Sequence, residues 1–154
     1  MKRILGLILA VTIVGALAVA GQARTAHQPP RHGALHVTKD CPRETYQGQA
    51  GGFCTIKSSN LGAIPVGSRV FYLEAAGSTG LDSDLVLYAG PGNIALGHVN
   101  LSFTTFTGEI VFAGGTGQFS GFRARVAVSF DGALWHWDGR YSLGPSGGND
   151  EDDD

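Results

Sequence analysis

The residues able to do chemistry in this sequence are mainly carboxylates that lie within or beside strand-like segments. Each is a candidate acid for a pocket, or else a solvated charge at a strand edge. The candidates are Glu74, Asp82, Asp84 and Glu109. His136 and Asp138 are two residues apart and so share one face of a strand. They form either an acid–base couple or a surface pair.

No activated nucleophile is recognisable, because the serines lie in turns and outside a G-x-S-x-G context. The segment Gly114–Gly117 follows an apolar run, but neither a lysine nor a helix pattern follows it, so it does not predict a phosphate loop. It predicts a tight connection that needs positive φ, with Phe119 entering the core. Gly90–Asn93 is likewise predicted to be a turn.

Cys41 and Cys54 are the two cysteines of the chain. In an exported protein they predict a disulfide, which would contribute about 3 kcal/mol; the alternative is two free thiols, one of them reactive. His27, His32 and His36 have no zinc-like spacing. We therefore expect no metal site and no cofactor.

The N-terminus combines Lys2 and Arg3 with an apolar run and an A-x-A sequence ending at Ala20. This pattern is typical of a cleaved signal peptide over 1–20; an uncleaved anchor is the alternative. We expect a secreted or periplasmic protein with no membrane contact after cleavage. A disordered linker is predicted over 21–40, a folded domain over 41–145 and a disordered acidic tail over 146–154.

Length and composition favour one β-rich domain. The chain has 154 residues, a formal net charge of −2 and 24 glycines without a collagen-like period. The charge excludes a basic nucleic-acid-binding surface. Short β-branched and aromatic runs between turn residues predict seven strands of an antiparallel sandwich or barrel. They are Phe53–Ser58, Ser68–Ala76, Asp84–Ala89, Ala95–Phe103, Gly108–Ala113, Arg123–Phe130 and Leu134–Leu143.

Alternation along these strands separates an apolar face from a polar one. In Arg123–Phe130 the apolar set begins at Ala124 and the polar set at Arg123. In Leu134–Leu143, Trp135, Trp137 and Tyr141 oppose the polar residues.

The segment Gly114–Gly121 (GGTGQFSG) resembles the G-G-[ST]-G-x-F-x-G motif of the allene oxide cyclase and dirigent superfamily. Arg123–Phe130 and Trp137–Tyr141 resemble that group's last two strands, and the similarity extends over residues 53–143. Within that superfamily, the sequence most resembles secreted bacterial members with an allene oxide cyclase barrel-like domain. The resemblance implies a closed antiparallel barrel of about eight strands, often trimeric, with an apolar cavity. The strand missing from the seven would lie around Val37 or within 62–66.

The resemblance also bears on single residues. Arg123 falls at the register of an arginine in dirigent proteins, whereas their acidic residue corresponds to Gly117 here. No local motif matches the glutamate and asparagines of the plant cyclases.

We therefore expect an all-β secreted barrel that binds, and orients, a small hydrophobic or aromatic molecule. The cavity candidates are Tyr72, Tyr88, His98 and Asn100. One alternative is an isomerase or cyclase, or a dirigent-like coupling protein, whose catalytic candidates are Glu74, Asp84 and Arg123. Another is a non-catalytic interaction module, a homodimer or trimer, in which Trp135 and Trp137 pack between subunits.

Overall fold

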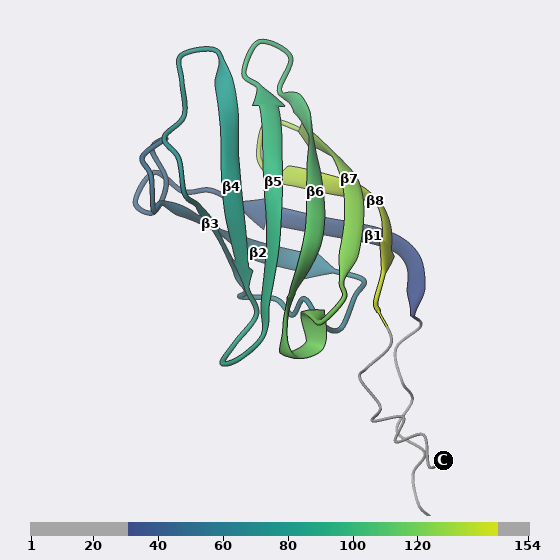
Figure 1. Ribbon diagram of the computed structural model, residues 1–154. Coiled ribbons are helices and arrows are strands. Elements are labelled where there is room, and N and C mark those ends of the chain that lie inside the picture. Colours follow the sequence, from purple (N-terminus) through teal and green to yellow (C-terminus); the bar gives the residue numbers. More distant parts are fainter. Residues whose placement is uncertain (1–30, 145–154) are drawn as a thin grey trace, which may run out of the picture.

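A computed structural model describes residues 31–144, which form one closed antiparallel barrel (Figure 1). Each strand pairs with its neighbours in sequence, and β8 pairs with β1 to close the sheet. The strands are β1 (His32–Asp40), β2 (Phe53–Ser59), β3 (Arg69–Tyr72), β4 (Gly80–Tyr88), β5 (Ile94–Ser102), β6 (Thr107–Thr116), β7 (Arg123–Phe130) and β8 (Trp135–Ser142). The prediction of a closed all-β barrel of about eight strands is confirmed.

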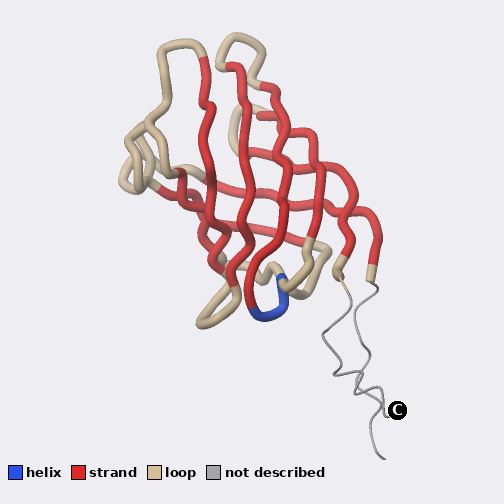
Figure 2. Tube along the Cα trace, in the orientation of Figure 1, coloured by secondary structure: helices blue, strands red, loops and turns tan. Residues whose placement is uncertain are grey.

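Strands make up most of the described chain, and one 3-10 turn, η1 (Gly117–Phe119), interrupts them between β6 and β7 (Figure 2). Within residues 31–144 no helix has the length and apolar character needed to cross a membrane. The predicted signal peptide, the first part of the predicted linker and the acidic tail lie outside the described residues.

The alternation of side chains explains why these segments form a barrel. Along β7 every second residue is buried, beginning with Ala124, while Arg123 and Arg125 are exposed. In β8, Trp137 and Tyr141 are buried in the same phase. Closing the sheet gives every such apolar face a shared interior and leaves no sheet edge unpaired.

The linker prediction over 21–40 is wrong for its last nine residues, because His32–Asp40 forms β1. This strand pairs with both β2 and β8 and so supplies the strand that was sought around Val37. Leu35 and Val37 are buried. This strand was not predicted, because a Pro- and His-rich sequence precedes it and most of its stability comes from non-local pairing.

Phenylalanine side chains fill one end of the barrel interior. Phe119 and Phe122, on the connection from β6 to β7, are fully buried at the end where β1 begins. The Phe122 ring contacts those of Phe119 and Phe112, with centroids 5.2 and 5.5 Å away. Phe119 therefore enters the core as predicted, and Gly114 and Gly117 have the expected positive φ.

Two inward-facing glycines allow adjacent strands to approach closely. A Cβ atom on Gly139 would lie 2.1 Å from the Arg125 carbonyl oxygen, and one on Gly108 would lie 2.2 Å from that of Asn100. Since the obstructing atoms are backbone, no side-chain movement could relieve the overlap. Glycine is therefore required at both positions by the close approach of β6 to β5 and of β8 to β7.

Candidate functional site

The residues expected to line a cavity divide between the inside and the outside of the barrel. Tyr72 lies in the interior and is 2% exposed. Tyr88, His98 and Asn100 are exposed on the outer surface. The catalytic candidates Glu74, Asp84 and Arg123 are exposed as well. The alternation of β3, β4, β5 and β7 places them there, because each lies in the polar phase of its strand or in the loop that follows.

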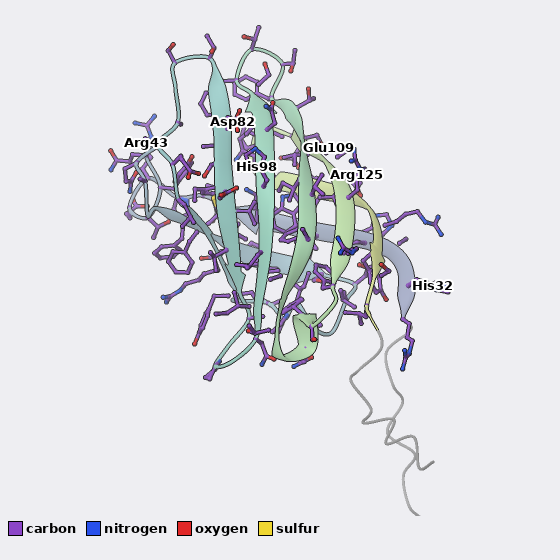
Figure 3. All side chains as sticks on the ribbon, viewed as in Figure 1. His32, Arg43, Asp82, His98, Glu109 and Arg125 are labelled. Carbon is purple, nitrogen blue, oxygen red and sulfur yellow. A yellow bond between two sulfur atoms is a disulfide. The ribbon has the colours of Figure 1, made fainter. Side chains whose placement is uncertain are left out.

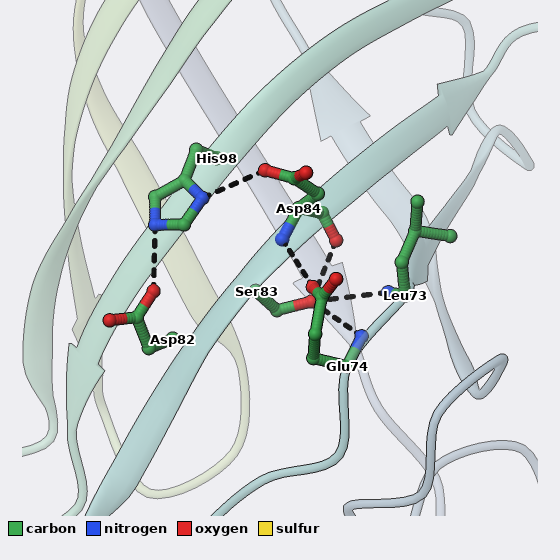
Figure 4. A network of polar contacts seen from close by, with 6 residues as sticks. All are labelled: Leu73, Glu74, Asp82, Ser83, Asp84 and His98. Atoms are coloured by element: carbon green, nitrogen blue, oxygen red, sulfur yellow. Dashed lines mark hydrogen bonds and ion pairs between the residues drawn. The ribbon is translucent and has the colours of Figure 1, made fainter.

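Several of these outer residues meet in one polar network on β4 and β5 (Figure 4). His98 lies between two carboxylates, with Nε2 2.8 Å from Asp82 and Nδ1 2.9 Å from Asp84. Asp84 hydrogen-bonds to the ring and, with Asp82, raises the pKa of His98 above its ordinary value. The arrangement favours an imidazolium on an open surface, where ion pairs contribute little stability.

Beside this network, the side chains of Ser83 and Glu74 accept hydrogen bonds from backbone amides. The β3–β4 pairing reaches Tyr72, and the chain then leaves the sheet. The Ser83 hydroxyl accepts hydrogen bonds from the amides of Leu73 and Glu74, and the Glu74 carboxylate accepts one from the amide of Asp84. Glu74 therefore has a structural role, because its carboxylate is bonded to the backbone of β4.

A shallow outer groove of about 460 Å³ lies beside His98. Its apolar wall includes Leu73, Val86, Leu96 and Val111, and Leu96 is 50% exposed. The groove opens onto the outer face of β4–β7, across which Asp82, His98, Glu109 and Arg125 are labelled in Figure 3.

Arg123 lies on the outer face of β7, opposite Ser142 of β8. A groove of about 350 Å³ runs past it and past Arg125 and Arg140. Arg125 donates from Nη1 to both carboxylate oxygens of Glu109, at 2.7 and 2.8 Å. Arg123 therefore belongs to a solvated cationic surface and does not reach the interior.

The pairing considered for His136 and Asp138 does not occur. His136 contacts Asp131 at 2.7 Å, and Asp138 contacts His36 of β1 at 2.7 Å. Trp137 is fully buried within the barrel, so the hypothesis that it packs between subunits is wrong. The error arose because an apolar strand face does not by itself distinguish an interior from an interface.

The predicted disulfide between Cys41 and Cys54 is present. It joins the chain just after β1 to β2, closing the loop that carries Tyr46. The Tyr46 ring packs on that of Tyr72, with centroids 4.9 Å apart. The disulfide and this ring contact hold the 41–52 loop across the barrel end that contains Tyr72.

A buried lysine lies directly beneath this loop. Lys39 is 4% exposed and shares the inward phase of β1 with Leu35 and Val37. Its Nζ donates a hydrogen bond to the Tyr72 hydroxyl. It also lies 4.0 Å from each disulfide sulfur.

Aromatic rings surround the lysine amine on the remaining sides. Lys39 Nζ lies 5.0 Å from the ring centroid of Tyr72, 5.7 Å from that of Trp135 and 5.5 Å from that of Trp137. We call Lys39, Tyr46, Tyr72, Trp135 and Trp137 the lysine cluster. The ion pairs formed within residues 31–144 do not include Lys39.

Burial without a carboxylate partner disfavours the ammonium form. It lowers the pKa of Lys39 to about 7, and the aromatic rings offset only part of that cost. Burial also raises the pKa of Tyr72, and the neighbouring Tyr46 adds to that effect. Both phenols therefore stay protonated, and the lysine becomes a neutral amine at mildly alkaline pH.

Two polar atoms of the lysine cluster are buried without a hydrogen-bond partner, the Tyr46 hydroxyl and Trp137 Nε1. Such orphaned groups cost about 1–3 kcal/mol each. Folded proteins retain few of them, and they occur at sites that bind a water, ion or ligand. The lysine cluster is thus a polar, incompletely bonded site at one end of an otherwise apolar interior.

Sequence reasoning did not identify Lys39 or Tyr46 as site residues. The available signal was the spacing of Leu35, Val37 and Lys39, which puts a lysine in the apolar phase of a strand. That signal could be used only if 32–40 were recognised as a strand.

The fold and the site together define a small closed β-barrel with an amine enclosed by aromatic side chains at one mouth. No family model, curated protein or solved structure matches the chain. The described residues contain no group of three or more His, Cys, Asp or Glu side chains arranged to hold a metal ion.

Proposed function

We propose that this protein binds a small apolar or aromatic molecule at the lysine cluster. The observation that carries the proposal is a buried amine without a counter-ion, next to two orphaned polar atoms, in a barrel whose other interior residues are nearly all apolar. Burying these groups lowers stability. Perturbed titratable groups of this kind are concentrated at functional sites.

The chemistry of the lysine cluster indicates which ligands would fit. Indole and phenol rings would contact an aromatic or apolar body, while the amine, the Tyr46 hydroxyl and Trp137 Nε1 would contact one polar end. Trp135 and Tyr46 are the partly exposed members of the lysine cluster, so a ligand would enter past their side chains. A ligand would enter by displacing the Tyr46 ring from Tyr72.

The test is a titration of the protein with phenol, benzyl alcohol and cyclohexanol, followed by tryptophan fluorescence and thermal unfolding. We expect the aromatic compounds to change the emission of Trp135 and Trp137 and to raise the melting temperature. Trp135→Leu should weaken binding, whereas Leu96→Ser, in the outer groove, should leave it unchanged.

The opposite pattern would place the ligand in the outer groove and refute the interior site. Absence of any response from wild type and from Tyr46→Ala, whose mouth is wider, would count against binding altogether.

We also propose that the protein is exported by cleavage of residues 1–20 and works outside the cytoplasm. The Cys41–Cys54 disulfide supports an oxidising compartment. Membership of the allene oxide cyclase and dirigent superfamily is proposed on the Gly114–Gly121 motif, and a closed eight-stranded barrel is compatible with it. Mass determination of the secreted chain would test the cleavage. Light scattering would test whether it is a dimer or trimer.

A further inference from the structure

The lysine cluster has the parts needed for a covalent bond to its ligand as well as a non-covalent one. Its amine is enclosed by three aromatic rings, hydrogen-bonded to a phenol and outside every ion pair of residues 31–144. A lysine that served only to stabilise the fold would be expected to meet a carboxylate or to extend its amine into solvent. Lys39 does neither, although it lies at the mouth of the barrel.

We propose that Lys39 captures small aromatic aldehydes as an imine within the barrel. This inference rests on the proposed function, because it specifies the ligand class of the same site. The aromatic rings would hold the aryl group, and the aldehyde carbon would meet Nζ. The Tyr72 hydroxyl, already bonded to Nζ, is placed to donate to the carbonyl oxygen.

The reaction balances without an oxidant or a metal. The Nζ lone pair forms the C–N bond while the carbonyl π electrons move to oxygen, and a proton passes from nitrogen to that oxygen to give a carbinolamine. The C–O bond then breaks, oxygen leaves as water with the second amine proton, and nitrogen and carbon share a double bond. The products are one imine and one water for each aldehyde and amine.

The state of the amine favours this step. Imine formation requires a neutral amine, and burial lowers the pKa of Lys39 to about 7. The titratable side chains that face it are Tyr46 and Tyr72, and burial raises the pKa of both. Capture should therefore increase as the pH rises through about 7 and then remain level while the phenols stay protonated.

The sequence provides an internal control for this chemistry. Apart from Lys2 near the N-terminus, the lysines of the chain are Lys39 and Lys57. Lys57 lies in β2, but its side chain is 49% exposed and its amine lies 3.7 Å from Asp40. One protein thus carries a buried and an exposed amine that can be compared in the same reaction.

The experiment is to incubate the protein with benzaldehyde and sodium cyanoborohydride at pH 8, which reduces the imine to a stable secondary amine. Peptide mass spectrometry then assigns adducts to Lys39, Lys57 and the N-terminal amine. We expect Lys39 to be modified about tenfold or more faster than Lys57, and the preference to disappear in guanidinium. Tyr46→Ala should accelerate labelling of Lys39, and Lys57→Arg should not change it.

The result that would overturn the inference is labelling of Lys39 that is no faster than labelling of Lys57 in both wild type and Tyr46→Ala. Binding of benzyl alcohol, which has no carbonyl group, separates the two proposals. If benzyl alcohol binds and benzaldehyde is not captured, the imine is refuted and the binding site stands. If neither compound binds, both proposals fail. Because the comparison is made between two lysines of the same protein, it does not depend on the folding of any Lys39 variant.

Discussion

Replacing Lys39 by methionine should stabilise the protein in a strongly pH-dependent way. Methionine has a similar length and is apolar, so it removes the buried amine while keeping most of the packing. Burial lowers the pKa of Lys39 from 10.5 to about 7. That difference corresponds to about 5 kcal/mol at about 1.4 kcal/mol per pKa unit.

The sign follows from proton binding in the two states. Between pH 7 and 10.5 the unfolded chain carries a proton on Lys39 that the native protein lacks. The free energy of unfolding of wild type therefore rises with pH across this window. Below pH 7 both states are protonated, and the full penalty of the buried charge is present.

The assay is urea unfolding of wild type and Lys39→Met, with the disulfide intact, from about pH 6 to about pH 9. The advantage of the variant should be largest at the acid end and should shrink by about 2 kcal/mol between pH 7 and 9. Taking the difference between the proteins cancels titrating groups remote from Lys39, such as His98. An advantage that stays constant over this range would mean that Lys39 remains charged, and would refute the reasoning about its burial.

Three further outcomes are expected. Replacing Cys41 and Cys54 together by serine should lower the free energy of unfolding by about 3 kcal/mol, measured in urea; an unchanged value would mean that the loop is held by other contacts. Gly139→Ala should destabilise by about 1–3 kcal/mol, because its Cβ would meet backbone 2.1 Å away, whereas Gly62→Ala, with no atom within 4 Å, should melt like wild type. Asp84→Asn should shift the pKa of His98 back toward its ordinary value in an NMR titration, because Asp84 is the main cause of its elevation.

Much of the fold could be predicted because the barrel interior imposes a period of two on the sequence. In β7 the apolar set that begins at Ala124 faces inward throughout, and each of the seven expected segments overlaps a strand of the barrel. The first strand was not predicted, because it is polar at its outer positions and follows a Pro-rich stretch. Its stability comes from pairing with β2 and β8, which local sequence does not report.

The site was harder to predict for a related reason. Glu74, Asp84 and Arg123 were chosen by chemical type, but their strand phase places them outside. Lys39 was passed over because lysine is rarely buried, and its three ring neighbours come from β3 and β8, far away in sequence. Only closure of the barrel brings them together.

The two ends of the described chain leave the barrel side by side, since His32 of β1 pairs with Ser142 of β8. Lys39 lies near the other end of β1, so the lysine cluster is at the end of the barrel away from both (Figure 1). A tag or surface attached through either end would therefore leave the mouth facing solution. The same proximity would allow a short peptide to join residues 31 and 144, so that new ends could be cut in the 103–106 turn between β5 and β6, beside Trp135, and the barrel immobilised in the opposite orientation.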